Sequence, residues 1–163
     1  MESEIVLPTF CPFFLSLILA QVAACAQGTL FFYNHVPAAG LDAPVLDIKS
    51  WPGGKGAGKG DKHCWVEALK IYGLTEETVG AFKGNPLDQL EPIAKAHIPI
   101  LAVVGDADTV VPYPENTAVM EGNYKMLGGK IEVIMKHNGD HHPHSLKDPK
   151  PIVDFLLANA YKN

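Results

Sequence analysis

The chain has 163 residues, of which 47% are hydrophobic and 19% are charged, and its formal net charge at pH 7 is -5. A chain of this length forms one modest hydrophobic core, so a single globular unit is expected. The sparse and mainly acidic charge leaves no broad basic face for a phosphate backbone, and nucleic acid is therefore excluded as a partner.

Residues 1–28 are expected to form a separate apolar segment. Ile5–Ala26 carries no charge and fits three interpretations: a signal peptide, a lipoprotein signal with Cys25 as the lipidated residue, or a buried strand. The acidic start and two prolines oppose a secretory signal, and they also argue against a membrane span. We therefore expect no membrane span. The protein is exported (periplasmic, extracellular or lipid-anchored) under the first two interpretations and cytoplasmic under the third.

Residues 29–163 are expected to form one domain in which strands and helices alternate. In chain order, the pattern predicts a strand at Ala43–Ile48, a helix at Trp65–Tyr72, a short helix capped by Thr75, a helix from Asn85 to Ala96, a strand at Ile98–Val104, a helix at Glu115–Leu127, a strand at Lys130–Met135 and an amphipathic helix at Ile152–Tyr161. Strands separated by helices imply right-handed crossovers and a parallel sheet. The predicted fold class is α/β with three layers, α/β/α.

The segment from Trp51 to Gly60 is too rich in glycine for a regular element, so a surface loop is predicted. It contains G-x-x-x-x-G-K, which is close to a phosphate-binding P-loop. The match fails because Gly60 stands where a Ser or Thr would bind magnesium. Nucleotide binding is not expected.

Two strand ends carry the candidate catalytic residues. Asp108 follows the strand at Ile98–Val104, and His141 follows the strand at Lys130–Met135. Neighbouring parallel strands place such residues side by side, as a carboxylate that orients an imidazole requires. Asp after a strand more often only forms a turn, and the pairing with a histidine is what favours catalysis for Asp108.

The segment Gly105–Pro112 reads G-x-x-D-x-x-V-P and resembles the last part of the α/β-hydrolase fold, whose triad follows the order Ser, Asp, His. Asp42–Asp47, Trp51–Gly54 and His141–Leu146 are similar to exported bacterial esterase-like members. The resemblance begins near Leu41 and runs to the C-terminus. It implies hydrolysis of a small-molecule carboxylic ester without a cofactor, with Asp108 and His141 as acid and base.

The nucleophile of that family is not recognisable. The serines are Ser3, Ser16, Ser50 and Ser145, and none lies in G-x-S-x-G. The best remnant of the elbow is Ala24–Gly28, where Ala26 occupies the serine's place. Cys25 and Cys64 are weaker candidates. We therefore expect an incomplete or catalytically impaired hydrolase, and the alternative is a non-catalytic module that binds a ligand or partner on the same scaffold.

Two further expectations concern metal binding and self-association. The histidine-rich loop supplies possible metal ligands, namely His137, Asp140, His141, His142 and His144, but their spacing is not that of a helical zinc motif, so no metal site is predicted. The full family fold has strands in the order 1-2-4-3-5-6-7-8, and this chain supplies the last three. The strand at Ala43–Ile48 would then have an open edge that favours self-association, unless the N-terminal run pairs with it.

Overall fold

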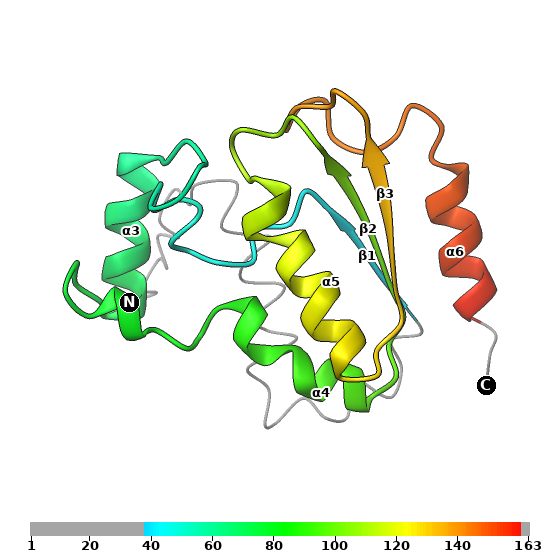
Figure 1. The fold of residues 1–163 in the computed structure, drawn as a ribbon, viewed down its shortest axis with the longest axis horizontal. Helices are drawn as coiled ribbons and strands as arrows, with labels where there is room; N and C mark the ends of the chain where they lie inside the picture. The colour runs from blue at the N-terminus through cyan, green and yellow to red at the C-terminus, as the bar shows by residue number, and fades with distance from the viewer. Residues whose placement is uncertain (1–37, 161–163) are drawn as a thin grey trace, which may run out of the picture.

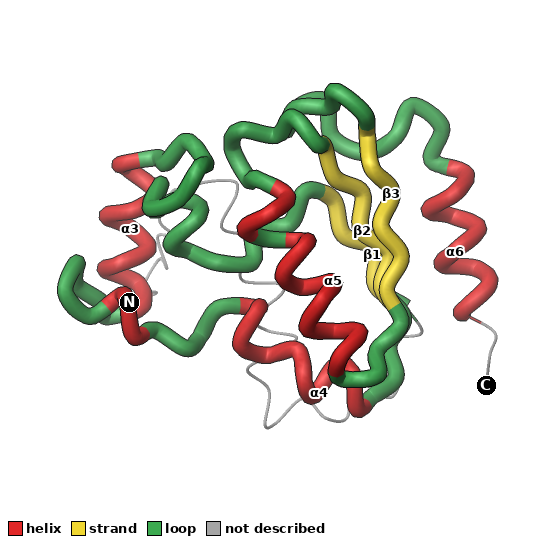
Figure 2. Tube along the Cα trace, viewed as in Figure 1, coloured by secondary structure: helices red, strands yellow, loops and turns green. Residues whose placement is uncertain are grey.

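The computed structural model describes residues 38–160. The predicted N-terminal segment, including Cys25 and Ala26, lies outside these residues. The strands are β1 (Ala39–Asp42), β2 (Ile100–Gly105) and β3 (Ile131–Lys136). The α-helices are α3 (Lys62–Tyr72), α4 (Leu90–Lys95), α5 (Thr117–Met126) and α6 (Lys150–Ala160), and short 3-10 turns occupy Val79–Ala81, Pro86–Gln89 and Tyr113–Glu115 (Figures 1 and 2).

The three strands form a parallel sheet in the order β1-β2-β3. Ala39 pairs with Ile100, and Ile100 in turn pairs with Ile131. Helices α4 and α5 cover one face of the sheet, and α6 lies on the other face (Figure 1). The predicted α/β class, the three layers and the parallel sheet are confirmed.

The central strand is buried along its whole length. All of its side chains from Ile100 to Val104 are at most 3% exposed, because helices cover both faces of the sheet. An uninterrupted apolar run is typical of such a strand, and this is why the run at Ile98–Val104 predicted β2. Ile100 and Ala102 pack with Met120 and Tyr124 in one hydrophobic cluster beneath α4 and α5.

A second hydrophobic cluster lies beside the sheet, beneath α3. Trp65 and Ala68 of the helix pack there against Ile48, Trp51 and other side chains of the loop that follows β1. Asp61 caps α3 by accepting a hydrogen bond from the Cys64 amide at 2.8 Å, so this helix begins three residues before the predicted start.

The predicted strand at Ala43–Ile48 is wrong. The strand is instead Ala39–Asp42, and the following residues turn away from the sheet, with Ala43 at a φ of 39°. Pro44 has no amide to donate to a strand partner. The apolar side chains of this segment are buried all the same, which explains why the run looked like a strand.

Thr75 does not cap a helix. Its hydroxyl accepts a 3.3 Å hydrogen bond from the Thr78 amide within a turn, and only a 3-10 turn at Val79–Ala81 follows. Other predicted helices are confirmed with shifted ends. Asn85 forms a capping box with Asp88 before α4. The C-terminal helix has its predicted inner side half-buried, made of Ile152, Phe155, Leu156 and Ala160.

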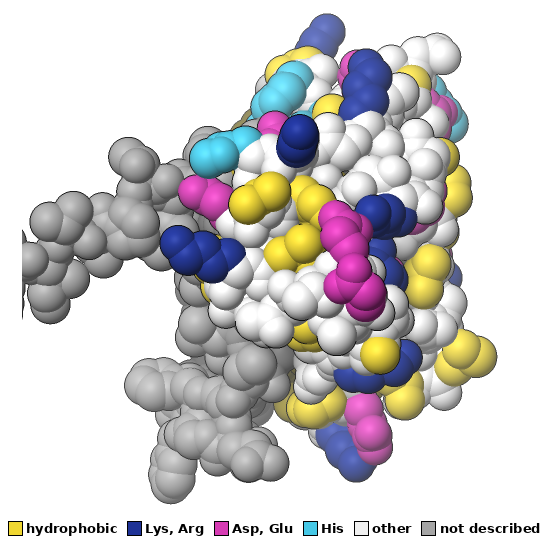
Figure 3. All heavy atoms as spheres, turned by 90° about the vertical axis from the view of Figure 1, so that its left-hand side faces the viewer, with side chains coloured by type: hydrophobic (Ala, Val, Ile, Leu, Met, Phe, Trp, Pro, Cys, Tyr) yellow, Lys and Arg dark blue, Asp and Glu magenta, His cyan; other side chains and the backbone are white. Residues whose placement is uncertain are grey.

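The surface agrees with the modest charge of the chain. On the face shown in Figure 3, acidic, basic and apolar side chains are interspersed, and no single sign of charge dominates. Within residues 38–160, no helix has the length and apolar character needed to cross a bilayer.

Candidate functional site

The site lies at the carboxyl ends of β2 and β3. The loop after β2 carries Asp108, and the loop after β3 carries His141. Nδ1 of His141 lies 2.9 Å from Oδ2 of Asp108, and the two side chains are only 3% and 1% exposed. Because a carboxylate only accepts hydrogen bonds, Nδ1 is the protonated nitrogen. The tautomer leaves Nε2 as the ring nitrogen that can take up a proton.

The Asp108 carboxylate accepts hydrogen bonds both from its own loop and from His141. Its Oδ1 accepts hydrogen bonds from the amides of Val110 and Val111, both at 2.8 Å, while Oδ2 pairs with His141. The turn-forming role and the histidine-orienting role are therefore both present, one on each oxygen. The backbone amides fix the carboxylate in the direction that the imidazole requires.

Burial opposes the ionisation of Asp108, but the hydrogen bonds from His141, Val111 and Val110 outweigh it and lower the pKa of this carboxyl below its usual value. A lowered folded-state pKa stabilises the protein above the unfolded pKa of about 3.9, and the contribution is lost as the pH falls through the folded value. We expect Asp108→Asn to cost about 2 kcal/mol at neutral pH, the size of a hydrogen bond to a charged group.

The difference between wild type and Asp108→Asn should shrink as the pH falls below about 4, because the wild-type carboxyl becomes neutral. Urea unfolding over a series of pH values measures this difference in the free energy of unfolding. The matched control is Asp106→Asn, since Asp106 pairs with His137 at 3.2 Å on the surface and should change stability by less than about 1 kcal/mol. If the difference in unfolding free energy between wild type and Asp108→Asn did not change with pH, the lowered pKa of Asp108 would be contradicted.

Asp140 and a close backbone contact hold the two loops together. Oδ1 of Asp140 accepts hydrogen bonds from the amides of His141 at 2.8 Å and Thr109 at 3.4 Å. The Ala107 amide donates to the carbonyl of Gly139 at 3.0 Å. From the sequence, Asp140 was a possible metal ligand only, and its role as a bridge between the loops is visible only in the folded chain.

His142 and His144 pack on the ring of His141. Their ring centroids lie 5.0 and 4.8 Å from that of His141, in edge-to-face arrangements. Nδ1 of His144 lies 3.6 Å from Oδ2 of Asp42 at the end of β1. Burial lowers the pKa of His144; Asp42 opposes this shift, and the neighbouring His141 and His142 reinforce it. These two exposed histidines lie directly against the dyad.

The other histidine, serine and cysteine residues considered from the sequence do not belong to the Asp108–His141 pair. His137 is on the surface with Asp106. The Ser50 hydroxyl is held by Glu115 at 2.7 Å and by Asn116 at 3.0 Å. Ser145 follows the histidine in the chain, whereas the family's nucleophile precedes the acid. Cys64 is 4% exposed and disulfide-bonded, so it offers no free thiolate.

The glycine-rich loop lies against the Asp108 loop. The Lys59 amide donates to the carbonyl of Thr109 at 2.7 Å, and the Ala57 amide donates to the carboxylate of Glu115. The Asp61 carboxylate caps α3, so it takes the helix N-terminus where a P-loop holds phosphate. The glycine-rich loop is therefore held against the loop that carries Asp108, by the Lys59–Thr109 backbone bond and by Glu115.

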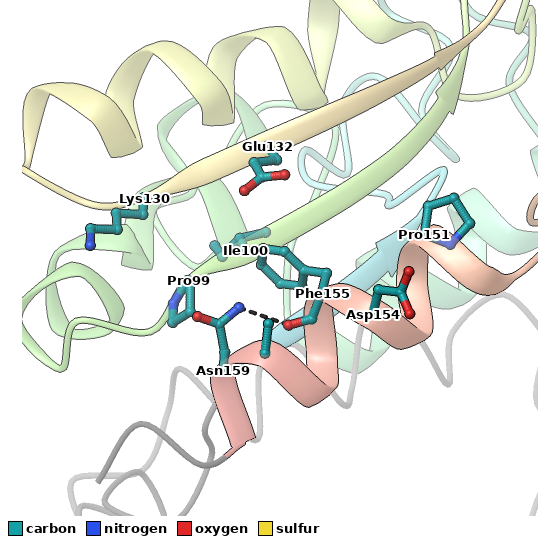
Figure 4. Close-up of a pocket in the computed structure, with 9 residues that line it drawn as sticks. Pro99, Ile100, Lys130, Glu132, Pro151, Asp154, Phe155 and Asn159 are labelled. Carbon is teal, nitrogen blue, oxygen red and sulfur yellow. Dashed lines mark hydrogen bonds between the residues drawn. The ribbon is translucent and has the colours of Figure 1, made fainter.

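A groove of about 510 Å³ lies at the opposite end of the sheet, between α6 and the starts of β2 and β3. Figure 4 shows Phe155 pointing from α6 toward Ile100, with Lys130 and Glu132 on the other side. Asp108 and His141 do not line this groove, since they follow the other ends of the strands. It is separate from the dyad.

No family model matches the chain, and no curated protein matches it. Among solved structures, it is similar to a crystal structure of puromycin hydrolase and to one of a mutant of that enzyme complexed with PGG. Each shares 23% sequence identity with a TM-score of 0.49, and the match covers 72% of this chain and 16% of the other chain. This chain thus spans 16% of the length of those proteins.

Proposed function

We propose that the chain is an α/β-hydrolase-like protein of the carboxylic-ester hydrolase type, with Asp108 and His141 as its acid–base pair. The 2.9 Å contact between His141 Nδ1 and Asp108 Oδ2, buried at the ends of adjacent parallel strands, is the observation that carries the proposal. The strand order also supports it. Three parallel strands that are neighbours in chain order agree with the last three strands of the family fold.

The pair is expected to act on water. Asp108 holds the tautomer in which Nε2 of His141 accepts a proton, and Nε2 then deprotonates a water molecule that attacks the ester carbonyl. The tetrahedral intermediate collapses and releases the alcohol, which receives the proton from His141. Within residues 38–160, neither Ser50 nor Ser145 lies in a nucleophile elbow, so this part of the chain offers no serine for an acyl-enzyme step, and we expect hydrolysis by the His–Asp pair to be slow.

The test is hydrolysis of p-nitrophenyl acetate by the purified chain at neutral pH in the presence of a chelator. A positioned general base contributes about 10²- to 10⁴-fold, and we expect acceleration of this size over buffer. His141→Ala should abolish the acceleration. His137→Ala should keep it, because His137 belongs to an exposed His–Asp pair of the same chemistry.

Equal rates for wild type and His141→Ala would overturn the proposed catalytic role. A folded chain without any turnover would instead favour the alternative, a module that binds a ligand or a partner on the same scaffold.

A further inference from the structure

The loop after β3 holds a cluster of three histidines, and the proposed reaction uses only one of them, His141. His141, His142 and His144 each offer a ring nitrogen, and the three nitrogens lie within 4.8 Å of one another. The rings of His142 and His144 also meet edge to face, with centroids 4.5 Å apart. Three imidazoles on one short loop with ring nitrogens this close together form a donor set suited to zinc or copper.

Two carboxylates contact the Nδ1 atoms of histidines in this cluster. Asp108 holds Nδ1 of His141 at 2.9 Å, and Asp42 lies 3.6 Å from Nδ1 of His144. Histidines that bind a metal through Nε2 usually donate Nδ1–H to a carboxylate or carbonyl, which fixes the ring. Oδ1 of Asp42 is buried and has no hydrogen-bond partner among residues 38–160, so this carboxylate retains an acceptor for His144 when the ring turns.

We propose that His141, His142 and His144 bind one divalent transition-metal ion, with Zn²⁺ as the best fit and a water molecule as the fourth ligand. Three histidines and an open position form an established zinc geometry. The sequence offers these three histidines as possible ligands, but their spacing did not predict a site because they belong to a folded loop and not to a helix.

The cluster must contract slightly to bind the ion. With Zn–N distances near 2.1 Å, the nitrogens of a tetrahedral site lie about 3.4 Å apart. His141 is held in place by Asp108, so the other two rings must make the movement. Both are on the surface, and the side chain of His144 is 43% exposed, which gives the rings freedom to turn and the ion a path to enter.

Metal binding would use Nε2 of His141, the atom that acts as general base in the proposed reaction. The two roles therefore exclude each other, and a bound ion inhibits the base. The binding itself does not rest on the proposed hydrolase function, because it requires only the three imidazoles and their carboxylates.

Calorimetric titration with Zn²⁺ tests the site in a chain stripped of metal and purified without a polyhistidine tag. We expect one ion per chain. His144→Ala should weaken binding at least 10-fold, and Asp42→Asn should weaken it by about 10- to 100-fold, the usual effect of removing a carboxylate behind a ligand. The control is His137→Ala, which removes a surface histidine outside the cluster and should leave the affinity unchanged.

The proposal is overturned if no saturable binding occurs, or if His144→Ala binds as tightly as wild type. Equal weakening by His137→Ala would show adventitious surface binding and also overturn it. Circular dichroism of each variant checks that the fold is retained, and Asp42→Asn tests the site without removing a ligand. A chain that binds zinc but hydrolyses no ester would contradict only the proposed function.

Discussion

Replacing Gly105 with alanine is expected to separate Asp108 from His141 and to destabilise the fold by about 3 kcal/mol. A Cβ atom at this position would lie 2.1 Å from the carbonyl oxygen of Gly139 and 3.0 Å from that of Asp140. Both obstacles are backbone atoms, so no side-chain rotation relieves the clash. The loop that carries His141 must therefore move away from the end of β2.

Such a movement stretches the contacts that define the site. The Ala107 amide donates to the Gly139 carbonyl at 3.0 Å, and His141 pairs with Asp108 at 2.9 Å, so neither bond tolerates a shift of more than about 0.5 Å. Urea unfolding measures the stability. The proton NMR signal of the His141 Nδ1–H, which a carboxylate partner deshields, reports on the dyad.

The control is Gly122→Ala in α5. A Cβ at Gly122 meets nothing within 4 Å, so alanine should stabilise this helix by about 0.5–1 kcal/mol. Opposite signs for the two glycine substitutions are the expected result. If Gly105→Ala proved as stable as wild type with the Nδ1 signal unchanged, the close approach of the two loops would not hold in solution.

The dyad could be predicted from the sequence because it follows from local patterns. The apolar run of β2 marks a strand buried on both faces, and the residues after two adjacent parallel strands must meet at one edge of the sheet. Asp108 and His141 therefore came together without knowledge of any long-range contact. The same reasoning predicted the parallel order of the sheet.

The first strand was misplaced because its formation depends on partners far along the chain. Ala39–Asp42 has the sequence AGLD, which carries no strand preference, and it is a strand because it pairs with residues 100–103 of β2. The apolar segment after it is buried by contacts to α3 and α5. Local hydrophobicity thus predicted burial correctly and the type of element wrongly.

The supporting polar residues were missed for the same reason. Asp140 joins the loops that carry Asp108 and His141 over 31 residues of sequence, and Asp42 reaches the amide of Ser145 over 103 residues. In sequence, each is an ordinary polar residue of a turn or strand end. Only the folded chain shows that these carboxylates position the histidine loop.

Asn116→Ala is expected to be among the most damaging single substitutions, with a loss of about 3–5 kcal/mol in the free energy of unfolding. Asn116 is 1% exposed at the start of α5. Its Oδ1 accepts hydrogen bonds from the amides of Leu46 at 3.0 Å and Asp47 at 3.3 Å, while Nδ2 donates to Ser50 and to the carbonyl of Pro112. The Asn116 side chain thus takes the place of a strand partner for the amides of Leu46 and Asp47.

Alanine would leave the amides of Leu46 and Asp47 without their hydrogen-bond acceptor, and each such buried group costs about 1–3 kcal/mol. The control is Asn123→Ala, which makes the same change on the same helix at a half-buried position. That variant should be neutral or slightly more stable, since alanine is the better helix former. Urea unfolding gives the free energies of unfolding of the two variants for this comparison. Equal stabilities would mean that the loop after β1 is held by its apolar contacts alone and that the Asn116 hydrogen bonds are dispensable.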